Sequence, residues 1–414
     1  MNSKKLFQQV RILDPEQKID TITDVLVVDN VIQQINPQIK IEDNSIQIID
    51  GTSLILAPAL VDLYSNSGEP GYEDRETLAS LNTVAQTGGF SRLAILPNTN
   101  PAVDNENMVS WLRSKTSLYD TKFYIWGALT RDLMGETIAP LAELAEAGVV
   151  GFTDNRPHHN LQLIRKLLEY AQPFNLPVAL VPTQLQLHSG GVIREGRNSI
   201  RFGLPASPEI AESVAVATLL EIASLTTTPL HLMRISTARG VKLIERAKQE
   251  GLNVTASVNW HHLLLSTQMI ASYDPNLRFD PPLGNQNDRL ALIEGVKSGV
   301  IDTIAIDHQP YTYEEKTVAF AQAPVGAIGL ELALPLLWQN LVTTEELTAL
   351  QLWQSLSTNP LKCLQQKTIS LEVGQPAELI LFSPQKTWHV KQSTLKSLSS
   401  NTYWLDKQLQ GKVL

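Results

Sequence analysis

The chain has 414 residues, 43% hydrophobic and 18% charged, so it can bury a large core and carries no signature of disorder. Its net charge of −9 argues against nucleic acid as a partner, because nucleic acid attracts basic surfaces. One cysteine, Cys363, excludes a disulfide framework, and no apolar run is long enough for a membrane span or a signal-peptide core, so we expect a cytoplasmic protein.

The two ends of the chain are predicted to be rich in β-strands. In the first 56 residues, apolar and polar residues alternate in short segments between polar turns, with no long helical stretch. Expected strands lie at 10–13, 23–28, 31–35 and 46–49, and β character returns after about residue 370, at 377–382 and 387–390. We therefore expect residues 1–56 and 370–414 to form one small β-sandwich domain.

Between these ends, residues 57–369 alternate apolar strand-like runs with amphipathic helical stretches, which is typical of parallel β/α units. The expected strands are 60–63, 92–96, 123–128, 149–152, 177–181, 230–235, 253–258 and 303–306. The expected helices are 73–87, 140–147, 161–170, 207–225, 238–249 and 288–299. Eight strands can close a (β/α)8 barrel, so the predicted fold class is α/β, a TIM-like barrel with a small β-sandwich beside it.

A series of short segments resembles the dihydroorotases of the amidohydrolase superfamily, in the bacterial class whose bridging zinc ligand is an aspartate. The first, VDLYSNSGEPG at 61–71, is similar to that family's Asp-x-His-x-His-Leu-Arg-Glu-Pro-Gly. The match runs in order from about residue 50 to 384. Its other segments are GGF (88–90), LPNTNP (96–101), GFTD (151–154), GGVIREG (190–196), ISTARG (235–240), WHHLLL (260–265), DPPL (280–283), IDHQP (306–310) and VGAIGLE (325–331).

The resemblance implies a known chemistry, in which zinc-bound hydroxide interconverts dihydroorotate and N-carbamoyl-aspartate. It also implies where the ligands would lie. The His-x-His pair falls on Tyr64 and Asn66, which are poor ligands beside imidazole. The third histidine falls on Val181, or on Pro182 if the gap is placed differently, and neither can coordinate. The fourth falls on Arg234, a permanent cation that repels a divalent metal.

Of the implied ligands only two acids remain, Asp154 at the bridging position and Asp307 at the position of the catalytic aspartate. Zinc lowers the pKa of bound water from about 15.7 to about 7, which corresponds to about 12 kcal/mol of hydroxide formation. A carboxylate acting as a general base contributes only about 10²–10⁴-fold. We therefore predict that the zinc is absent, that the family mechanism fails, and that Asp307 is a remnant of a catalytic residue.

The implied substrate site has changed as well. The family's substrate arginine falls on Gly68, its asparagine on Asp280 and its histidine on Tyr311, and Asn98 alone matches the family residue. Loss of a cation and gain of an acid disfavour an anionic ligand. Asn98 is therefore predicted to be a remnant of the substrate site.

Arg234 is expected to compensate for the missing metal. A buried carboxylate needs a partner, so we hypothesise a buried ion pair between Arg234 and Asp154 in the emptied site. The alternative is an arginine on the barrel rim that is paired with water.

The remaining polar candidates have simpler interpretations. His261 and His262 are expected on a strand, where neighbours point to opposite faces, so they cannot both enter one site. His308 is expected to support the loop after Asp307. A structural or surface role is also favoured for the others: His158 and His159 in a polar loop, His188 without a defined role, and Ser65, for which no base stands near in the sequence.

Three functions follow from these observations. The favoured one is a non-catalytic dihydroorotase-like protein of pyrimidine biosynthesis that assembles with aspartate transcarbamoylase as a homo- or hetero-oligomer, a role that the resemblance implies for relatives without zinc ligands. The second is an active cyclic-amide hydrolase, such as a dihydroorotase, with a rebuilt site that uses Asp154, Asp307 and Asn98. The third is a small-molecule sensor that uses the vacated pocket.

Overall fold

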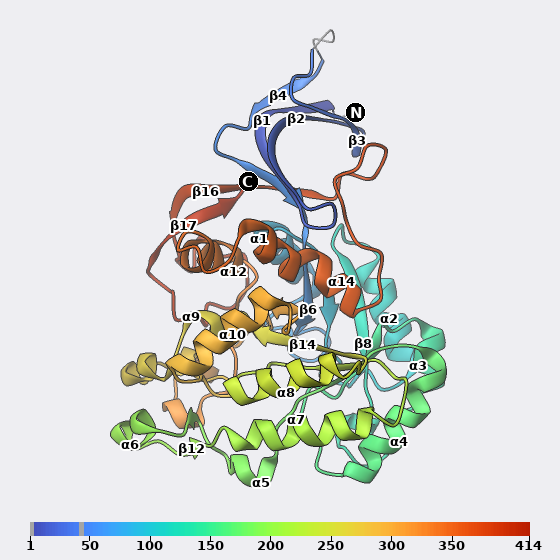
Figure 1. Cartoon of the computed structure of the whole chain (residues 1–414), viewed down its shortest axis with the longest axis vertical. Helices are drawn as coiled ribbons and strands as arrows, with labels where there is room; N and C mark the ends of the chain where they lie inside the picture. The colour runs from blue at the N-terminus through green and yellow to red at the C-terminus, as the bar shows by residue number, and fades with distance from the viewer. Residues whose placement is uncertain (1–3, 41–44) are drawn as a thin grey trace.

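Two separate sheets organise the chain, and both chain ends contribute to the smaller one (Figure 1). The computed structural model describes residues 4–40 and 45–414. Helices surround the larger sheet, and the smaller sheet lies beyond one end of it. Among the described residues, no helix combines the length and the apolar character that a membrane crossing requires.

The larger sheet is a barrel of eight parallel strands within the described residues, as predicted. Its last strand is followed by His308, which pairs with Ser65 at the end of the first strand, and Asn66 N donates to His308 O over 3.0 Å, so the barrel closes. The strands are β6 (Leu60–Ser65), β7 (Phe90–Ile95), β8 (Lys122–Gly127), β9 (Gly151–Phe152), β10 (Val178–Leu180), β13 (Leu230–Leu232), β14 (Val254–Asn259) and β15 (Thr303–Ala305).

The barrel strands are apolar because both of their faces are covered. All six residues of β6 are buried. Leu63, Tyr64, Trp126 and Met233 belong to a cluster that fills the interior, and Trp126 Nε1 donates to Leu63 O over 2.8 Å. The interior is therefore packed, and any site must lie at an end of the barrel.

The six predicted helices are present. The predicted helix 73–87 begins only at residue 78, because Thr77 forms a capping box with Ser80. The helices that follow barrel strands are α1 (Leu78–Gly88), α2 (Glu106–Thr116), α3 (Leu141–Ala147), α4 (Leu161–Ala171), α7 (Ile210–Ala223), α8 (Ala238–Gln249) and α10 (Gln286–Ser298). Of these, α2 was not predicted.

Shorter elements complete the barrel domain. A helical region that was not predicted consists of α12 (Ala333–Leu337), α13 (Ala349–Trp353) and α14 (Asn359–Cys363), with π-helical turns at Trp338–Val342 and Gln354–Thr358. The loops at the barrel mouth contain α5 (Leu185–His188), α6 (Arg197–Phe202), α9 (Trp260–Leu264), α11 (Tyr313–Lys316), a two-stranded sheet of β11 (Ile193–Arg194) and β12 (Ala206–Ser207), and short 3-10 turns.

The smaller sheet joins the two chain ends, as predicted. In the described residues its order is β17-β16-β5-β1-β2-β3, with β4 also paired to β1. These strands are β1 (Lys4–Asp14), β2 (Ile19–Val28), β3 (Val31–Asn36), β4 (Gln47–Asp50), β5 (Ile55–Pro58), β16 (Leu379–His389) and β17 (Gln408–Val413). The segments predicted at 377–382 and 387–390 form one strand, β16, while β5 and β17 were not predicted. The domain limits at residues 56 and 370 stay a prediction, and β5 runs across the first of them.

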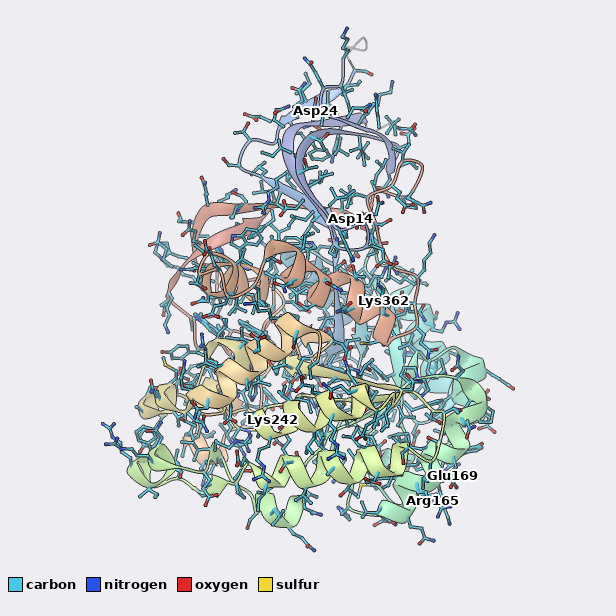
Figure 2. The ribbon with its side chains drawn as sticks, in the orientation of Figure 1. Asp14, Asp24, Arg165, Glu169, Lys242 and Lys362 are labelled. Carbon is cyan, nitrogen blue, oxygen red and sulfur yellow. The ribbon has the colours of Figure 1, made fainter. Side chains whose placement is uncertain are left out.

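Buried carboxylates fasten the smaller sheet (Figure 2). Asp14 is fully buried and accepts a hydrogen bond of 2.6 Å from Leu371 N, which ties the returning chain to the first strand. Asp24 accepts hydrogen bonds from Gln9 N and Ile39 N over 2.8 and 3.0 Å. Both acids therefore satisfy backbone donors that the sheet ladder leaves open.

The connection between β16 and β17 reaches the barrel mouth, and we call its residues 396–402 the strap. Asn401 is 5% exposed, accepts from Tyr311 N over 3.1 Å and donates to Gln309 O over 2.9 Å. Glu331 accepts hydrogen bonds of 3.0 Å from Lys396 N. The strap thereby joins the small sheet to the loops around the site.

Candidate functional site

The residues at the implied ligand positions lie at one end of the barrel. Tyr64 is the second-last residue of strand β6. The others follow the carboxyl ends of their strands, and barrel enzymes carry their sites at that end of the barrel. They are Asn66 after β6, Asp154 after β9, Val181 after β10, Arg234 after β13 and Asp307 after β15. The structure brings Arg234, Asp307 and Tyr64 together and places Asp154 in a separate network.

Arg234 forms a buried, bidentate ion pair with Asp307. The Nη2–Oδ1 distance is 2.6 Å and the Nε–Oδ2 distance is 2.8 Å, and the side chains are 4% and 3% exposed. Asn259 Nδ2 also donates to Asp307 Oδ2 over 3.0 Å, and Asn155 Oδ1 accepts from Arg234 Nη2 over 2.7 Å. The predicted pairing of Arg234 with Asp154 is therefore wrong: Asp307 lies within reach of the guanidinium, and Asp154 already has other donors.

Both members of this pair have left-handed backbone conformations. The φ angle is 54° at Arg234 and 52° at Asp307. Non-glycine residues rarely adopt such angles, and they persist only where the surrounding contacts compensate for the strain. The bidentate ion pair and the hydrogen bonds to Asn155 and Asn259 are contacts that compensate for the strain here.

Electrostatics holds Arg234 charged and its neighbour Tyr64 neutral. Burial acts to lower the pKa of Arg234, but the ion pair with Asp307 outweighs it and the pKa is raised. The guanidinium lies 5.6 Å from the ring centre of Tyr64. Burial raises the pKa of this fully buried phenol, whose oxygen is 3.1 Å from Ser257 Oγ. Tyr64 is therefore a neutral hydrogen-bonding group in the barrel core.

Asp154 stabilises a loop. Its oxygens accept from Leu129 N over 2.8 Å, Thr130 N over 3.0 Å and Thr130 Oγ1 over 2.5 Å. His158 Nε2 lies 3.2 Å away, and the His158 side chain is 3% exposed. The predicted surface role of His158 is wrong, because the loop turns this side chain inward against Asp154. His159 is exposed, as expected.

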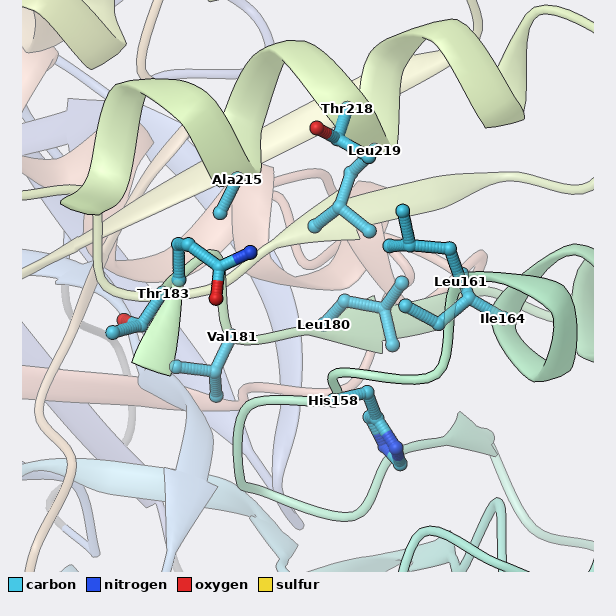
Figure 3. Close-up of a pocket in the computed structure, with 10 residues that line it drawn as sticks. His158, Leu161, Ile164, Leu180, Val181, Thr183, Ala215, Thr218 and Leu219 are labelled. Carbon is cyan, nitrogen blue, oxygen red and sulfur yellow. The ribbon is translucent and has the colours of Figure 1, made fainter. Parts of the chain in front are cut away.

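Val181, at an implied histidine position, is part of the apolar wall of a pocket (Figure 3). It is 7% exposed and lines a pocket between α4 and α7 together with Leu161, Leu180 and Leu219. His158 lines the same pocket at its lower side in the view of Figure 3. The side chains of α4 and α7 that line this pocket are not metal ligands. The pocket therefore supplies no ligand in place of the histidine that the resemblance implies.

The other histidines have structural partners. His261 and His262 lie in the short helix α9, so the expected strand alternation is wrong there, because Asn259 caps a helical turn. His261 Nδ1 is 2.9 Å from Asn259 Oδ1, and His262 Nε2 is 3.0 Å from Pro281 O. Both rings are buried, and burial lowers the pKa of His262 to about 4.

The three remaining polar candidates also make structural contacts. His308 Nδ1 accepts from Gly329 N over 3.1 Å, and its Nε2 is 3.4 Å from Glu76 Oε2. His188 Nδ1 is 2.8 Å from Ser207 Oγ. Ser65 is fully buried and donates to Asp62 Oδ2 over 2.8 Å. These contacts leave Ser65 inside the barrel wall, where no substrate can reach it.

A polar pocket lies at the barrel mouth, and we call it the mouth pocket. It is small, with a cavity volume of about 40 Å³. Asn98 Nδ2 donates to Asn66 Oδ1 over 2.8 Å, and Asn66 Nδ2 donates to His308 O over 3.1 Å. The residues that line it are Asn66, Ser67, Gly68, Tyr72, Arg75, Asn98, Gln309, Pro310 and Tyr311.

Gly68, at the implied position of the substrate arginine, cannot carry a side chain in this conformation. A Cβ atom there would lie 2.3 Å from the carbonyl oxygens of Tyr72 and Glu76. Real Cβ atoms essentially never approach so closely, so an arginine would require the loop to move. The backbone of this loop occupies the space that an arginine side chain at position 68 would need.

Arg75 is the cation that the sequence did not single out. Its Nη2 is 2.5 Å from Glu315 Oε1 and its Nε is 3.1 Å from Glu315 Oε2. Its guanidinium carbon lies 4.3 Å from the ring centre of Tyr72 and 5.0 Å from that of Tyr311. The Tyr-x-x-Arg spacing was the only local signal, because Glu315 is 240 residues away in the chain.

The residues at the implied metal site do not fit zinc. Tyr64, Asn66, Val181 and Arg234 offer a neutral phenol, a carboxamide, an alkyl group and a cation where imidazoles would be needed. Within residues 4–40 and 45–414, no group of three or more His, Cys, Asp or Glu side chains could hold a metal ion.

The fold is shared with solved hydantoinase structures. L-hydantoinase from Arthrobacter aurescens matches 100% of this chain and 94% of its own, with a TM-score of 0.85 and 20% identity. D-hydantoinase from Bacillus sp. AR9 gives a TM-score of 0.82 with 17% identity, over 99% of this chain and 92% of its own. At these identities the likeness concerns the fold.

Sequence comparison is more specific. A family model described as "Dihydro-orotase-like" matches residues 53–239. A Synechocystis protein named "Probable dihydroorotase-like protein" is 46% identical, with 98% of each chain covered. A "Dihydroorotase" of Ruminiclostridium cellulolyticum is 36% identical, over 99% of this chain and 96% of its own. The chain belongs to the dihydroorotase-like family.

Proposed function

We propose that this chain is a non-catalytic member of the dihydroorotase-like family and that it lacks zinc. The observation that carries the proposal is the buried ion pair between Arg234 and Asp307. A guanidinium stands at an implied ligand position and occupies both oxygens of the acid that would carry the proton. The pair is neutral as a whole, so Asp307 offers no net negative charge with which to attract a dication.

The chemistry of the pair supports this proposal. A general base needs a free lone pair within reach of the proton that it removes. Asp307 accepts from Arg234 Nε and Nη2 and from Asn259 Nδ2, and it is 3% exposed. Freeing one oxygen would leave a buried guanidinium partly unpaired, which is costly. We therefore propose that Asp307 has a structural role and that Asn98 is a remnant of the substrate site.

We further propose that the chain acts in the cytoplasm as a structural partner of aspartate transcarbamoylase. The whole barrel and the joined small sheet are kept although the site has changed, which fits a role that depends on the outer surface. A stable partnership of this kind would bury at least about 1,000 Å². The partner, the oligomer and the compartment are parts of the proposal, as is the absence of zinc.

The experiment compares the full chain with a variant that carries Tyr64→His, Asn66→His, Val181→His and Arg234→His. We expect the wild-type protein to contain no stoichiometric zinc by elemental analysis and to show no turnover of dihydroorotate. Zinc or a chelator should leave its melting temperature unchanged, whereas zinc should raise that of the four-histidine variant. Ordinary enzymatic turnover by the wild type would favour the alternative, an active cyclic-amide hydrolase with a rebuilt site, and would refute the proposal.

Partnership is tested separately. Purified chain and aspartate transcarbamoylase from the same source should co-elute in size-exclusion chromatography at a mass above that of either protein alone. Elution as two independent peaks at micromolar concentrations would refute the partnership and leave the absence of catalysis untouched. The four-histidine variant is the matched control, because its surface is unchanged and it should co-elute as the wild type does.

A further inference from the structure

We infer that the smaller sheet carries a binding site for a fatty carboxylate of medium chain length. The site is a cavity of about 560 Å³ between strands of this sheet and the end of helix α1, and we call it the sheet cavity. Ligand pockets typically measure about 300–1,000 Å³. The cavity shares no lining residue with the mouth pocket, so the inference goes beyond the function proposed above. Its apolar lining includes Phe7, Val27, Ile49, Leu56, Leu379 and Leu381.

Strand pairing places this apolar lining on one face of the sheet. Phe7 of β1 is paired with Val25 of β2 and with Ile49 of β4, and residues paired across neighbouring strands point to the same face. Leu56 of β5 is paired with Leu381 of β16 in the same way. Phe7, Val25 and Leu56 belong to one apolar cluster, so both sets of pairs share a face. The sheet cavity is therefore a recess in an apolar face.

This face is only partly covered by the rest of the chain. Leu56 is 1% exposed, whereas Ile49, Leu379 and Leu381 are partly buried although they line the same cavity. Apolar surface that remains in contact with water favours binding, because a hydrocarbon chain that covers it releases that water. The recess therefore suits a flexible apolar chain.

One cation stands on the same face. Lys5 is exposed, lines the sheet cavity and is paired with Val27 of β2, so its side chain shares the face of the apolar lining. Within residues 4–40 and 45–414 its ammonium group forms no ion pair, although the chain as a whole has a net charge of −9. Asn30 also lines the cavity and offers a carboxamide donor. A carboxylate can pair with Lys5 while the attached chain covers the apolar lining.

A second copy of this chain fits the recess less well. A twofold contact places the same patch of each copy against the other, and two recessed faces would leave the cavity unfilled. Such a contact would also bring the Lys5 ammonium groups of both copies to one apolar interface, which is costly. A single amphiphile meets neither difficulty.

The first test varies the chain length of the ligand. Octanoate, decanoate and the neutral 1-decanol are titrated into the full chain in isothermal titration calorimetry, below the concentrations at which they form micelles. We expect saturable binding of decanoate with a Kd of about 100 μM or tighter. Octanoate should bind about tenfold more weakly, because two methylenes are lost, and 1-decanol about two- to fivefold more weakly, because it cannot pair with Lys5. No saturable binding of decanoate, or equal binding of octanoate, would overturn the inference.

The second test reverses the charge at the cavity. Lys5→Glu should weaken decanoate binding by about five- to tenfold, and it should bind decyltrimethylammonium, the cation with the same chain, more tightly than the wild type does. Lys386→Glu is the matched control, because it makes the same change of charge at an exposed position of β16 that does not line the cavity. Equal effects of the two variants would show a response to net charge alone and would overturn the assignment to Lys5.

The third test locates the hydrocarbon chain. Leu379→Ser should weaken decanoate binding by about five- to tenfold, whereas Ile48→Ser should not, since Ile48 is 54% exposed and its neighbour Ile49 points into the cavity from the other face of β4. Unchanged binding by Leu379→Ser would place decanoate elsewhere and overturn the site. Sedimentation of the chain with phosphatidylglycerol vesicles, without binding of free decanoate, would also overturn it, because the face would then meet a lipid surface and not a single ligand.

Discussion

At the scale of single residues, Arg234 is the partner that balances a buried acid, Asp307. It supplies one positive charge to the acid at the mouth of the barrel and is itself anchored by Asn155. Because a guanidinium is always protonated, Arg234 cannot accept a proton as a general base does. The contact between Arg234 and Asp307 is buried, and both oxygens of the acid have hydrogen-bond donors.

Arg234 should therefore matter for stability and not for turnover. Arg234→Met is expected to lower the free energy of unfolding by about 3–5 kcal/mol, because it leaves the buried Asp307 charge with Asn259 as its remaining partner. The double variant Arg234→Met/Asp307→Leu should recover much of this loss, since no unpaired charge remains. The midpoint of guanidinium-induced unfolding measures both effects.

The matched control is an exposed arginine. Arg239 pairs with Glu209 over 3.4 Å, and the side chains are 56% and 45% exposed. Arg239→Met should change stability by only about 0–1 kcal/mol. A loss at Arg234→Met no larger than that of this control would show that the buried pair contributes little.

At this scale the sequence predicted which residues gather but not which pairs form. The ligand-position residues were found because parallel barrel strands bring their carboxyl ends together. The choice of Asp307 over Asp154 depends on the left-handed backbone of Arg234 and on the loop that binds Asp154. The inward turn of His158 and the contact of Arg75 with Glu315 have the same origin, because local sequence does not encode the path of a distant loop.

At the scale of elements, hydrophobic periodicity predicted the barrel strands and six helices. The missed helix α2 has few buried residues, namely Val109, Leu112 and Thr116, so its apolar stripe is narrow. The missed region α12 to α14 is buried on most sides, and a helix that is apolar all round has no periodic signal. Strand β17 was missed because its polar residues alternate with only a few buried ones.

The strap is the element whose role the sequence did not indicate. Its residues bind the mouth loops through one carboxamide, Asn401, which pairs with the backbone of Tyr311 and Gln309. Ile328 N donates to the backbone oxygen of Asn401 over 3.2 Å. Chain segments that are 75 to 92 residues apart in the sequence therefore meet at this residue.

Asn401→Ala should loosen the barrel mouth. It removes the partner of a partly buried N–H of Tyr311 and of a partly buried C=O of Gln309, so we expect a loss of about 0.5–1.5 kcal/mol for each hydrogen bond. Hydrogen exchange should accelerate in residues 309–311 and 396–402, with little change in the barrel strands. Gln408→Ala, an exposed position on β17, is the control. Unchanged exchange in both segments of the Asn401 variant would contradict the proposed fastening.

At the scale of the whole molecule, two buried acids connect the smaller sheet to the barrel. Asp14 holds the returning chain at Leu371, and Glu331 holds the strap at Lys396 and Ser397. The sequence predicted that both ends share a sheet, since each is rich in strands while the middle alternates strand and helix. It did not predict the attachment, because Glu331 and Lys396 are 65 residues apart.

Glu331 should make the stability of the whole chain depend on pH. Burial, with a further contribution from the charge of Glu76, raises the pKa of Glu331 from 4.5 to about 7. Between these pH values the folded protein binds more protons than the unfolded chain, so the free energy of unfolding falls as pH rises. The shift corresponds to about 3 kcal/mol lost between pH 4.5 and 8.

Glu331→Gln should remove this part of the pH dependence, because glutamine does not titrate. The measured quantity is the difference in unfolding free energy between wild type and variant at pH 4.5 and at pH 8. Other groups titrate in both proteins, so their contributions cancel in that difference. The wild type should lose its advantage as pH rises, since its carboxylate must be charged beside Glu76 in a buried place, whereas the amide never is. A difference that stays constant over this range would mean that water reaches Glu331 and that the strap is open in solution.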